Sequence, residues 1–145
     1  MWKKEDDWFW EGNVQKNIAE YLQEQGFDVK ATDTISKSTG VDIVAKKAEK
    51  NILIEVKGWP SDKYMDGPKK GQPKPTHPTL QAKHWLSEAF LTVIRRKSKF
   101  PGYTLAIGLP KFRRYTDLLN EISWAIETLG IKIFLVDSTG KVSEL

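Results

Sequence analysis

The chain contains no cysteine, and this absence excludes several kinds of site. It rules out a disulfide framework, a thiolate nucleophile, a cysteine-based zinc site and an iron–sulfur cluster. The two histidines are too few to build a zinc site without cysteine. No apolar run approaches the length of about 18 residues that a membrane span needs, and the charged N-terminus has no apolar core like that of a signal peptide. We therefore expect a cytoplasmic protein with no membrane partner.

The composition is otherwise that of one soluble domain. The 145 residues are 39% hydrophobic and 29% charged. A chain of this size buries roughly two-thirds of its unfolded surface, so it needs no covalent cross-links. Lysine and arginine outnumber the acids by 23 to 19, which gives a net charge of +4. This excess is modest, so the placement of the charges says more about a nucleic-acid partner than their sum.

Hydrophobic spacing predicts three helices and five strands. The helices are expected at residues 13–25, 78–97 and 116–129, and the strands at 27–31, 41–46, 52–59, 103–109 and 131–136. The order α-β-β-β-α-β-α-β predicts an α/β protein with a mixed sheet and helices on both sides. Residues 33–40 are turn-rich, and the basic cluster 95–97 ends a helix, where it offsets the helix dipole without any ligand.

Two further segments stand out from this pattern. Residues 1–12 are expected to form an aromatic-rich arm before one domain at 13–145. The aromatic side chains of the arm have two possible roles. They pack on the domain or on a second copy of the chain, or they form a platform on which nucleic-acid bases stack. Residues 60–77 are rich in proline, glycine and lysine, so we expect a mobile basic loop there, because such a segment is neither a helix nor a central strand.

Charged side chains interrupt the apolar strand predicted at 52–59, where burying them is costly. Alternation along the strand places Glu55 and Lys57 on the same face. If the hairpin is symmetric about Ala48 and Glu49, Asp42 lies opposite Glu55 with Cβ atoms about 5 Å apart. The two carboxylates would repel unless a cation such as Mg²⁺ lay between them, and Lys57 could then hold water or stabilise phosphoryl charge. The alternative is a cluster of surface charges on an exposed sheet edge.

The same residues resemble a known superfamily. The segment Gly40-Val41-Asp42-Ile43-Val44 and the segment Glu55-Val56-Lys57-Gly58, with twelve residues between Asp42 and Glu55, resemble the PD-(D/E)xK nucleases. The predicted helix that ends before Gly26-Phe27-Asp28-Val29 is similar to the opening helix of that superfamily. The segment Gln81-Ala82-Lys83-His84-Trp85 is similar to a helix motif of its exonuclease and resolvase branches. The resemblance implies a restriction-endonuclease-like αβββαβ core.

The resemblance also implies roles for individual residues. Asp42, Glu55 and the carbonyl of Val56 would bind Mg²⁺ or Mn²⁺. Lys57 would be the catalytic lysine, and Gln81 would orient a water molecule or a phosphate from its helix.

One position departs from the pattern of the superfamily. Many members carry a glutamate in the opening helix, where this chain has Gln15. An amide anchors a second metal ion less strongly than a carboxylate does. Glu11 and Glu20 are the alternative acids, and Glu20 is expected to point to solvent.

Basic residues of the loop are the candidate contacts to DNA. Phosphates of the backbone would suit Lys63, Lys69, Lys70 and Lys74. His84 shares a helical face with Gln81 and could contact a phosphate or water. Each of these residues could instead be an ordinary solvated side chain.

Three functional hypotheses remain open at this stage. The first is a Mg²⁺-dependent nuclease that hydrolyses DNA with an activated water. The second is an inactive nuclease-like domain that binds nucleic acid or a protein partner, and the third is a structural dimerisation domain. A chain of 145 residues has little room for a separate recognition domain. Sequence specificity would therefore need a homodimer or another partner.

Overall fold

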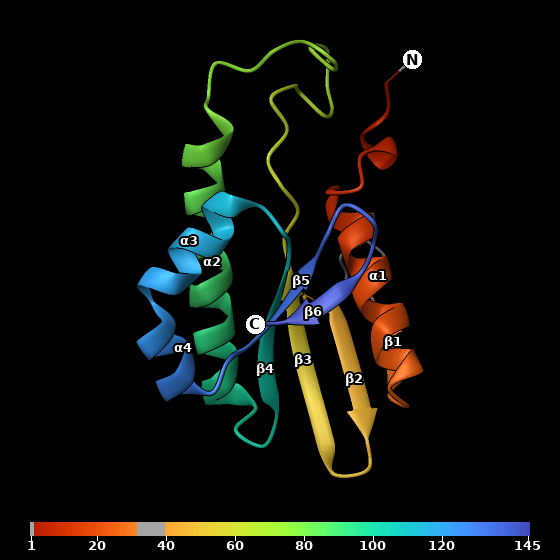
Figure 1. Cartoon of the computed structure of the whole chain (residues 1–145), viewed down its shortest axis with the longest axis vertical. Helices are drawn as coiled ribbons and strands as arrows, with labels where there is room; N and C mark the ends of the chain where they lie inside the picture. Colours follow the sequence, from red (N-terminus) through yellow and green to blue (C-terminus); the bar gives the residue numbers. More distant parts are fainter. Residues whose placement is uncertain (1, 32–39) are drawn as a thin grey trace.

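The computed structural model of the protein describes residues 2–31 and 40–145 (Figure 1). Its sheet has six strands that follow chain order from edge to edge. The strands are β1 (Asp28–Ala31), β2 (Ile43–Lys47), β3 (Lys50–Val56), β4 (Thr104–Pro110), β5 (Lys132–Val136) and β6 (Val142–Glu144). Strands β3, β4 and β5 are parallel, and the other neighbouring pairs are antiparallel. The predicted mixed sheet is therefore confirmed.

Helices cover both faces of this sheet (Figure 1). They are the 3₁₀ turn η1 (Lys4–Asp6), α1 (Glu11–Glu24), α2 (Pro78–Lys99), α3 (Arg113–Glu121) and α4 (Ser123–Leu129). Helix α1 packs its buried row Val14, Ile18 and Leu22 against one face, whereas α2 and α3 pack on the other. A Cβ atom at Gly108 of β4 would lie 2.3 Å from Ile18 Cδ1, so glycine is needed for this close approach of α1. Among the described residues, no helix is long and apolar enough to cross a membrane.

The structure corrects several predicted element boundaries. The expected loop at 47–51 is only a two-residue turn, because Lys47 pairs with Lys50 and the ladder continues to the turn. The helix predicted at 116–129 is two helices that meet at Ile122, whose φ of −114° and ψ of 19° are not helical. The sequence analysis does not predict strand β6, which pairs with β5 in an antiparallel arrangement. Apart from Gly40, the turn-rich segment 33–40 lies outside the described residues.

The arm lies across the segment that follows β3. The Trp59 amide donates a hydrogen bond to the Phe9 carbonyl at 3.0 Å. A Cβ atom at Gly58 would come within 2.7 Å of main-chain atoms of Phe9 and Glu11, so the two segments touch through their backbones. Trp59 also stacks on Phe112, with ring centroids 4.2 Å apart, and Trp8 stacks on Phe112 in turn. These contacts place the start of α1 beside the end of β3.

The loop at 60–77 folds back on itself above the sheet (Figure 1). Lys63 forms an isolated antiparallel bridge with Pro73. The Lys74 amide donates to the Asp62 carbonyl at 2.8 Å, and the Tyr64 amide donates to the Gln72 carbonyl at 2.9 Å. The mobility of this loop stays a prediction.

Candidate active site

The β2–β3 hairpin brings Asp42 and Glu55 together. Ile43 pairs with Ile54, so the predicted symmetric register is confirmed. Asp42 directly precedes Ile43 and Glu55 directly follows Ile54, so this register sets the two carboxylates opposite each other at the end of the hairpin. The Asp42 Oδ2 atom accepts a hydrogen bond of 2.7 Å from the Val56 amide. Buried Gln15 of α1 donates its side-chain amide to the Asp42 carbonyl at 3.2 Å. Asp42 is therefore fixed from both sides, through its carboxylate by β3 and through its backbone by α1.

A cavity of about 160 Å³ lies at this point, and its walls are strongly acidic. The charged side chains that line it are Glu11, Asp42, Glu55, Glu88 and Lys57. Among the residues that the structure describes, four carboxylates thus face one ammonium group, in a chain whose net charge is +4. The Lys57 Nζ atom lies 3.0 Å from Glu88 Oε1. A site with this excess of carboxylate attracts cations.

Glu55 is a buried carboxylate with a charged partner. Only 9% of the residue is exposed, and its Oε1 atom forms an ion pair of 3.1 Å with Nη1 of Arg96. Burial and the neighbouring Asp42 charge raise the pKa of Glu55 from 4.5 to about 7, although Arg96 and Lys57 act in the opposite direction. At neutral pH the carboxylates of the apo site therefore carry a cost in free energy that a bound cation would offset.

Replacing Glu55 with glutamine should remove a pH dependence of stability. The folded wild type binds more protons than the unfolded chain between pH 4.5 and about 7, so its stability falls as the pH rises through that window. This group should cost up to about 3 kcal/mol of unfolding free energy by pH 8, and Glu55→Gln should not show that loss. Urea unfolding at pH 4.5 and pH 8 without divalent metal measures it. The control is Glu20→Gln, which changes an exposed carboxylate. Equal pH dependence in Glu55→Gln and the wild type would contradict the assignment.

The donor chemistry of the cavity fits a hard divalent cation. Mg²⁺ is usually held by one or two carboxylates, with water and phosphate oxygens completing its shell. The residues that would hold it are Asp42, Glu55 and the carbonyl of Val56. Within residues 2–31 and 40–145, no three or more histidine, aspartate or glutamate residues are arranged to hold a metal ion. The binding of Mg²⁺ or Mn²⁺ at this cavity stays a prediction.

Other residues predicted for the site lie outside the acidic cavity. Gln81 is in the first turn of α2, and its Oε1 atom is buried without a hydrogen-bond donor among the described residues. His84 is exposed on α2, and Lys70 is exposed in the loop. Lys63 lies over the ring of Trp2, and Lys69 lies over the ring of Tyr64. Lys74 is half-buried in the loop. The roles predicted for these residues stay predictions.

The sequence analysis missed two residues of the site: Glu88, which lines the acidic cavity, and Arg96. Its position predicts that Arg96 offsets the dipole of its helix, yet its side chain pairs with Glu55 and donates to the Gly40 carbonyl. A signal was present in the sequence. The buried residues Ala82, Leu86, Ala89 and Val93 define the face of α2 toward the sheet, and Arg96 continues this row.

The fold and part of the sequence are similar to those of a known nuclease family. An acidic cavity with a lysine at the end of a β-hairpin, beside a mixed sheet with helices on both faces, is consistent with the restriction-endonuclease-like fold. Residues 12–70 match the family model Mrr_cat, described as "Restriction endonuclease", which is a PD-(D/E)xK nuclease family. The predicted resemblance is therefore confirmed over this segment, and the match indicates a nuclease-type function. It covers Asp42, Glu55 and Lys57 and ends before Gln81. Searches of curated proteins and of solved structures gave no match.

Proposed function

We propose that the protein is a metal-dependent nuclease that hydrolyses phosphodiester bonds of DNA. One observation carries the proposal: Asp42, Glu55 and Lys57 line the same small acidic cavity. Two carboxylates with a neighbouring ammonium group are suited to hold a divalent cation and to act on a phosphodiester beside it. A cluster of surface charges would not need the hydrogen bond that fixes the Asp42 carboxylate, nor the burial of Glu55.

Each residue has a distinct task in this mechanism. The Val56 amide holds the Asp42 carboxylate in place, and Arg96 favours the charged form of Glu55. The ammonium group of Lys57 positions a water molecule or stabilises the negative charge that grows on the phosphoryl oxygens. When bound, a divalent cation supplies the Lewis acidity that makes water a better nucleophile and offsets the charge of the transition state.

The inactive binding domain is the second candidate, and Gln15 is the observation that favours it. The amide of Gln15 donates to the Asp42 carbonyl and so has a structural task where many superfamily members carry an acid. Glu11 of the same helix, however, lines the acidic cavity and supplies a carboxylate from α1. A homodimer and a cytoplasmic location stay predictions under either candidate.

Asp42→Asn should weaken the binding of Mn²⁺. An amide can still accept the Val56 hydrogen bond, so the fold should persist, but the charge that holds the cation is lost. Because even outer partners of metal ligands typically contribute about 10- to 100-fold in affinity, a loss of about tenfold or more is expected. Isothermal titration calorimetry measures it, with Asp117→Asn on α3, whose side chain is 57% exposed, as the matched control. Equal binding by Asp42→Asn and the wild type would refute the metal assignment.

A further inference from the structure

A second and larger cavity adjoins the acidic one. Its volume is about 430 Å³, and it shares Glu11 and Lys57 with the acidic cavity. Its walls also carry Trp10, Trp59 and Trp85. Volumes of about 300–1,000 Å³ are typical of sites for small organic groups. Whatever enters this cavity lies next to the lysine that the proposed mechanism uses.

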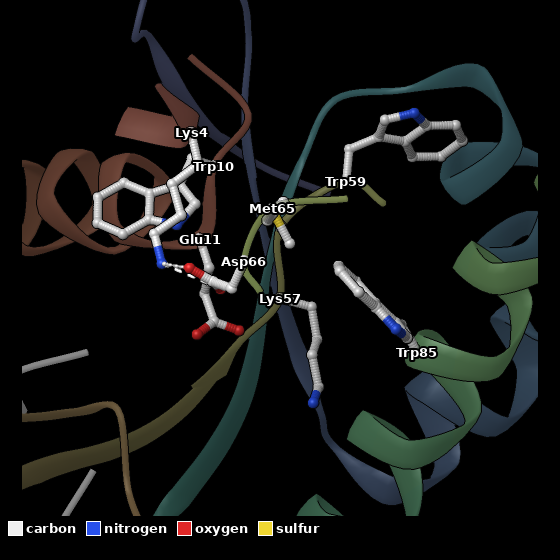
Figure 2. Close-up of a pocket in the computed structure, with 9 residues that line it drawn as sticks. Lys4, Trp10, Glu11, Lys57, Trp59, Met65, Asp66 and Trp85 are labelled. Carbon is white, nitrogen blue, oxygen red and sulfur yellow. Dashed lines mark hydrogen bonds and ion pairs between the residues drawn. The ribbon is translucent and has the colours of Figure 1, made fainter. Parts of the chain in front are cut away.

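Aromatic side chains from two separate parts of the chain form opposite walls of this cavity. Figure 2 shows Trp10 on one side, Trp85 of α2 on the other, and Lys57 between them. The ring of Trp10 lies against Gly12, where a Cβ atom would be only 2.2 Å from the ring, so its placement depends on glycine at that position. Trp85 is half-buried and pairs with no other ring in the part of the chain that the structure describes. Its ring lines the cavity and is a candidate surface on which a planar ligand stacks.

The charge of the second cavity differs from that of the first. Two lysines, Lys4 and Lys57, are matched by two carboxylates, Glu11 and Asp66, so the formal charge of its described lining residues is zero. Lys4 and Asp66 moreover neutralise each other in an ion pair of 3.3 Å. A neutral cavity with aromatic walls is a poor site for a phosphate or a metal ion. It is well suited to a flat, uncharged and polarisable group, because tryptophan faces stack on such groups.

We propose that this cavity binds one unpaired nucleobase of the substrate, on the nucleotide next to the phosphodiester that Lys57 addresses. The inference rests on the proposed function, because that function places the scissile phosphate at the acidic cavity. A base inside an intact duplex is stacked and paired, and extruding it costs free energy, whereas an unpaired base enters without that cost. The substrate class is therefore DNA with an unpaired nucleotide, in a single strand, a bulge or a branch.

The test compares two duplexes that differ by one base. Both carry a single bulged nucleotide, with its base present in one duplex and replaced by an abasic site in the other. Fluorescence anisotropy in EDTA measures binding without turnover. Since stacking on an aromatic side chain is a sizeable part of affinity for each unpaired base, the wild type should bind the duplex with the base about tenfold more tightly.

Variants of Trp85 show whether this preference arises in the cavity. Trp85→Ala should abolish the preference, and Trp85→Leu, which keeps an apolar side chain to preserve folding, should abolish it too. Trp124→Ala on α4, where the native side chain is 70% exposed, should retain it. Equal binding of the two duplexes by the wild type, or an unchanged preference in both Trp85 variants, would overturn the inference.

The same duplexes separate this inference from the proposed function. Mg²⁺-dependent cleavage with no preference for the unpaired base would refute the base site and leave the nuclease intact. A preference that depends on Trp85, in a protein that cleaves nothing with any metal, would support the base site and refute the nuclease.

Discussion

Lys57→Ala should lower the rate of DNA cleavage by about 100-fold or more while the protein still folds and binds DNA and metal. The ammonium group acts mainly in the transition state, so its removal costs rate far more than affinity. Its ion pair with Glu88 adds little to stability, because the Glu88 side chain is 67% exposed and such pairs contribute at most about 1 kcal/mol. Single-turnover cleavage beside an anisotropy titration separates the two effects.

Two further variants define the task of Lys57. Lys57→Arg should rescue cleavage poorly, since a planar guanidinium does not replace a compact ammonium in a cavity of about 160 Å³. Glu88→Gln removes the same ion pair but keeps the ammonium group, so it should lower the rate of DNA cleavage far less than Lys57→Ala does. Cleavage by Lys57→Ala at the wild-type rate would show that the catalytic assignment is wrong.

Arg96→Ala should destabilise the protein by about 1 kcal/mol at pH 8, because it leaves the buried Glu55 carboxylate without its partner, and a carboxyl with a wild-type pKa of about 7 limits that loss by taking up a proton. The loss should shrink as the pH falls through 7, where Glu55 takes up a proton and no longer needs a cation beside it. Urea unfolding at pH 5 and pH 8 measures both values.

Arg95→Ala is the matched control for this prediction. Arg95 is the neighbouring arginine on α2 and is exposed, so its loss should change stability little at either pH. Adding Glu55→Gln to Arg96→Ala should recover part of the loss, since the uncompensated charge is then gone. Equal stability of Arg96→Ala and Arg95→Ala at pH 8 would contradict the buried ion pair.

The hairpin was predictable from the sequence because its determinants are local. Alternation of period two decides which side chains share a face, and the position of the turn decides which residues oppose each other. The pairing of Ile43 with Ile54 confirms the register that sets Asp42 next to Glu55.

Other parts of the site depend on how elements that are distant in the sequence pack together. A local sequence pattern does not predict such packing. The arm lies against Gly58 through backbone contacts, and this places Glu11 and Trp10 at the two cavities. The contact of Arg96 with Glu55 joins residues 41 positions apart and depends on how α2 lies across the sheet. The strand β6 is three residues long and has one apolar side chain, so hydrophobic spacing does not predict it.

The most direct test of the proposed function is cleavage of DNA by the purified protein. Plasmid, linear duplex and branched DNA are incubated with Mg²⁺ or with EDTA, and Asp42→Asn is assayed beside the wild type. The acidic cavity predicts cleavage by the wild type with Mg²⁺, none in EDTA, and none by Asp42→Asn. Cleavage that persists in EDTA or in Asp42→Asn, or no cleavage with Mg²⁺ or Mn²⁺, would contradict a metal-dependent nuclease.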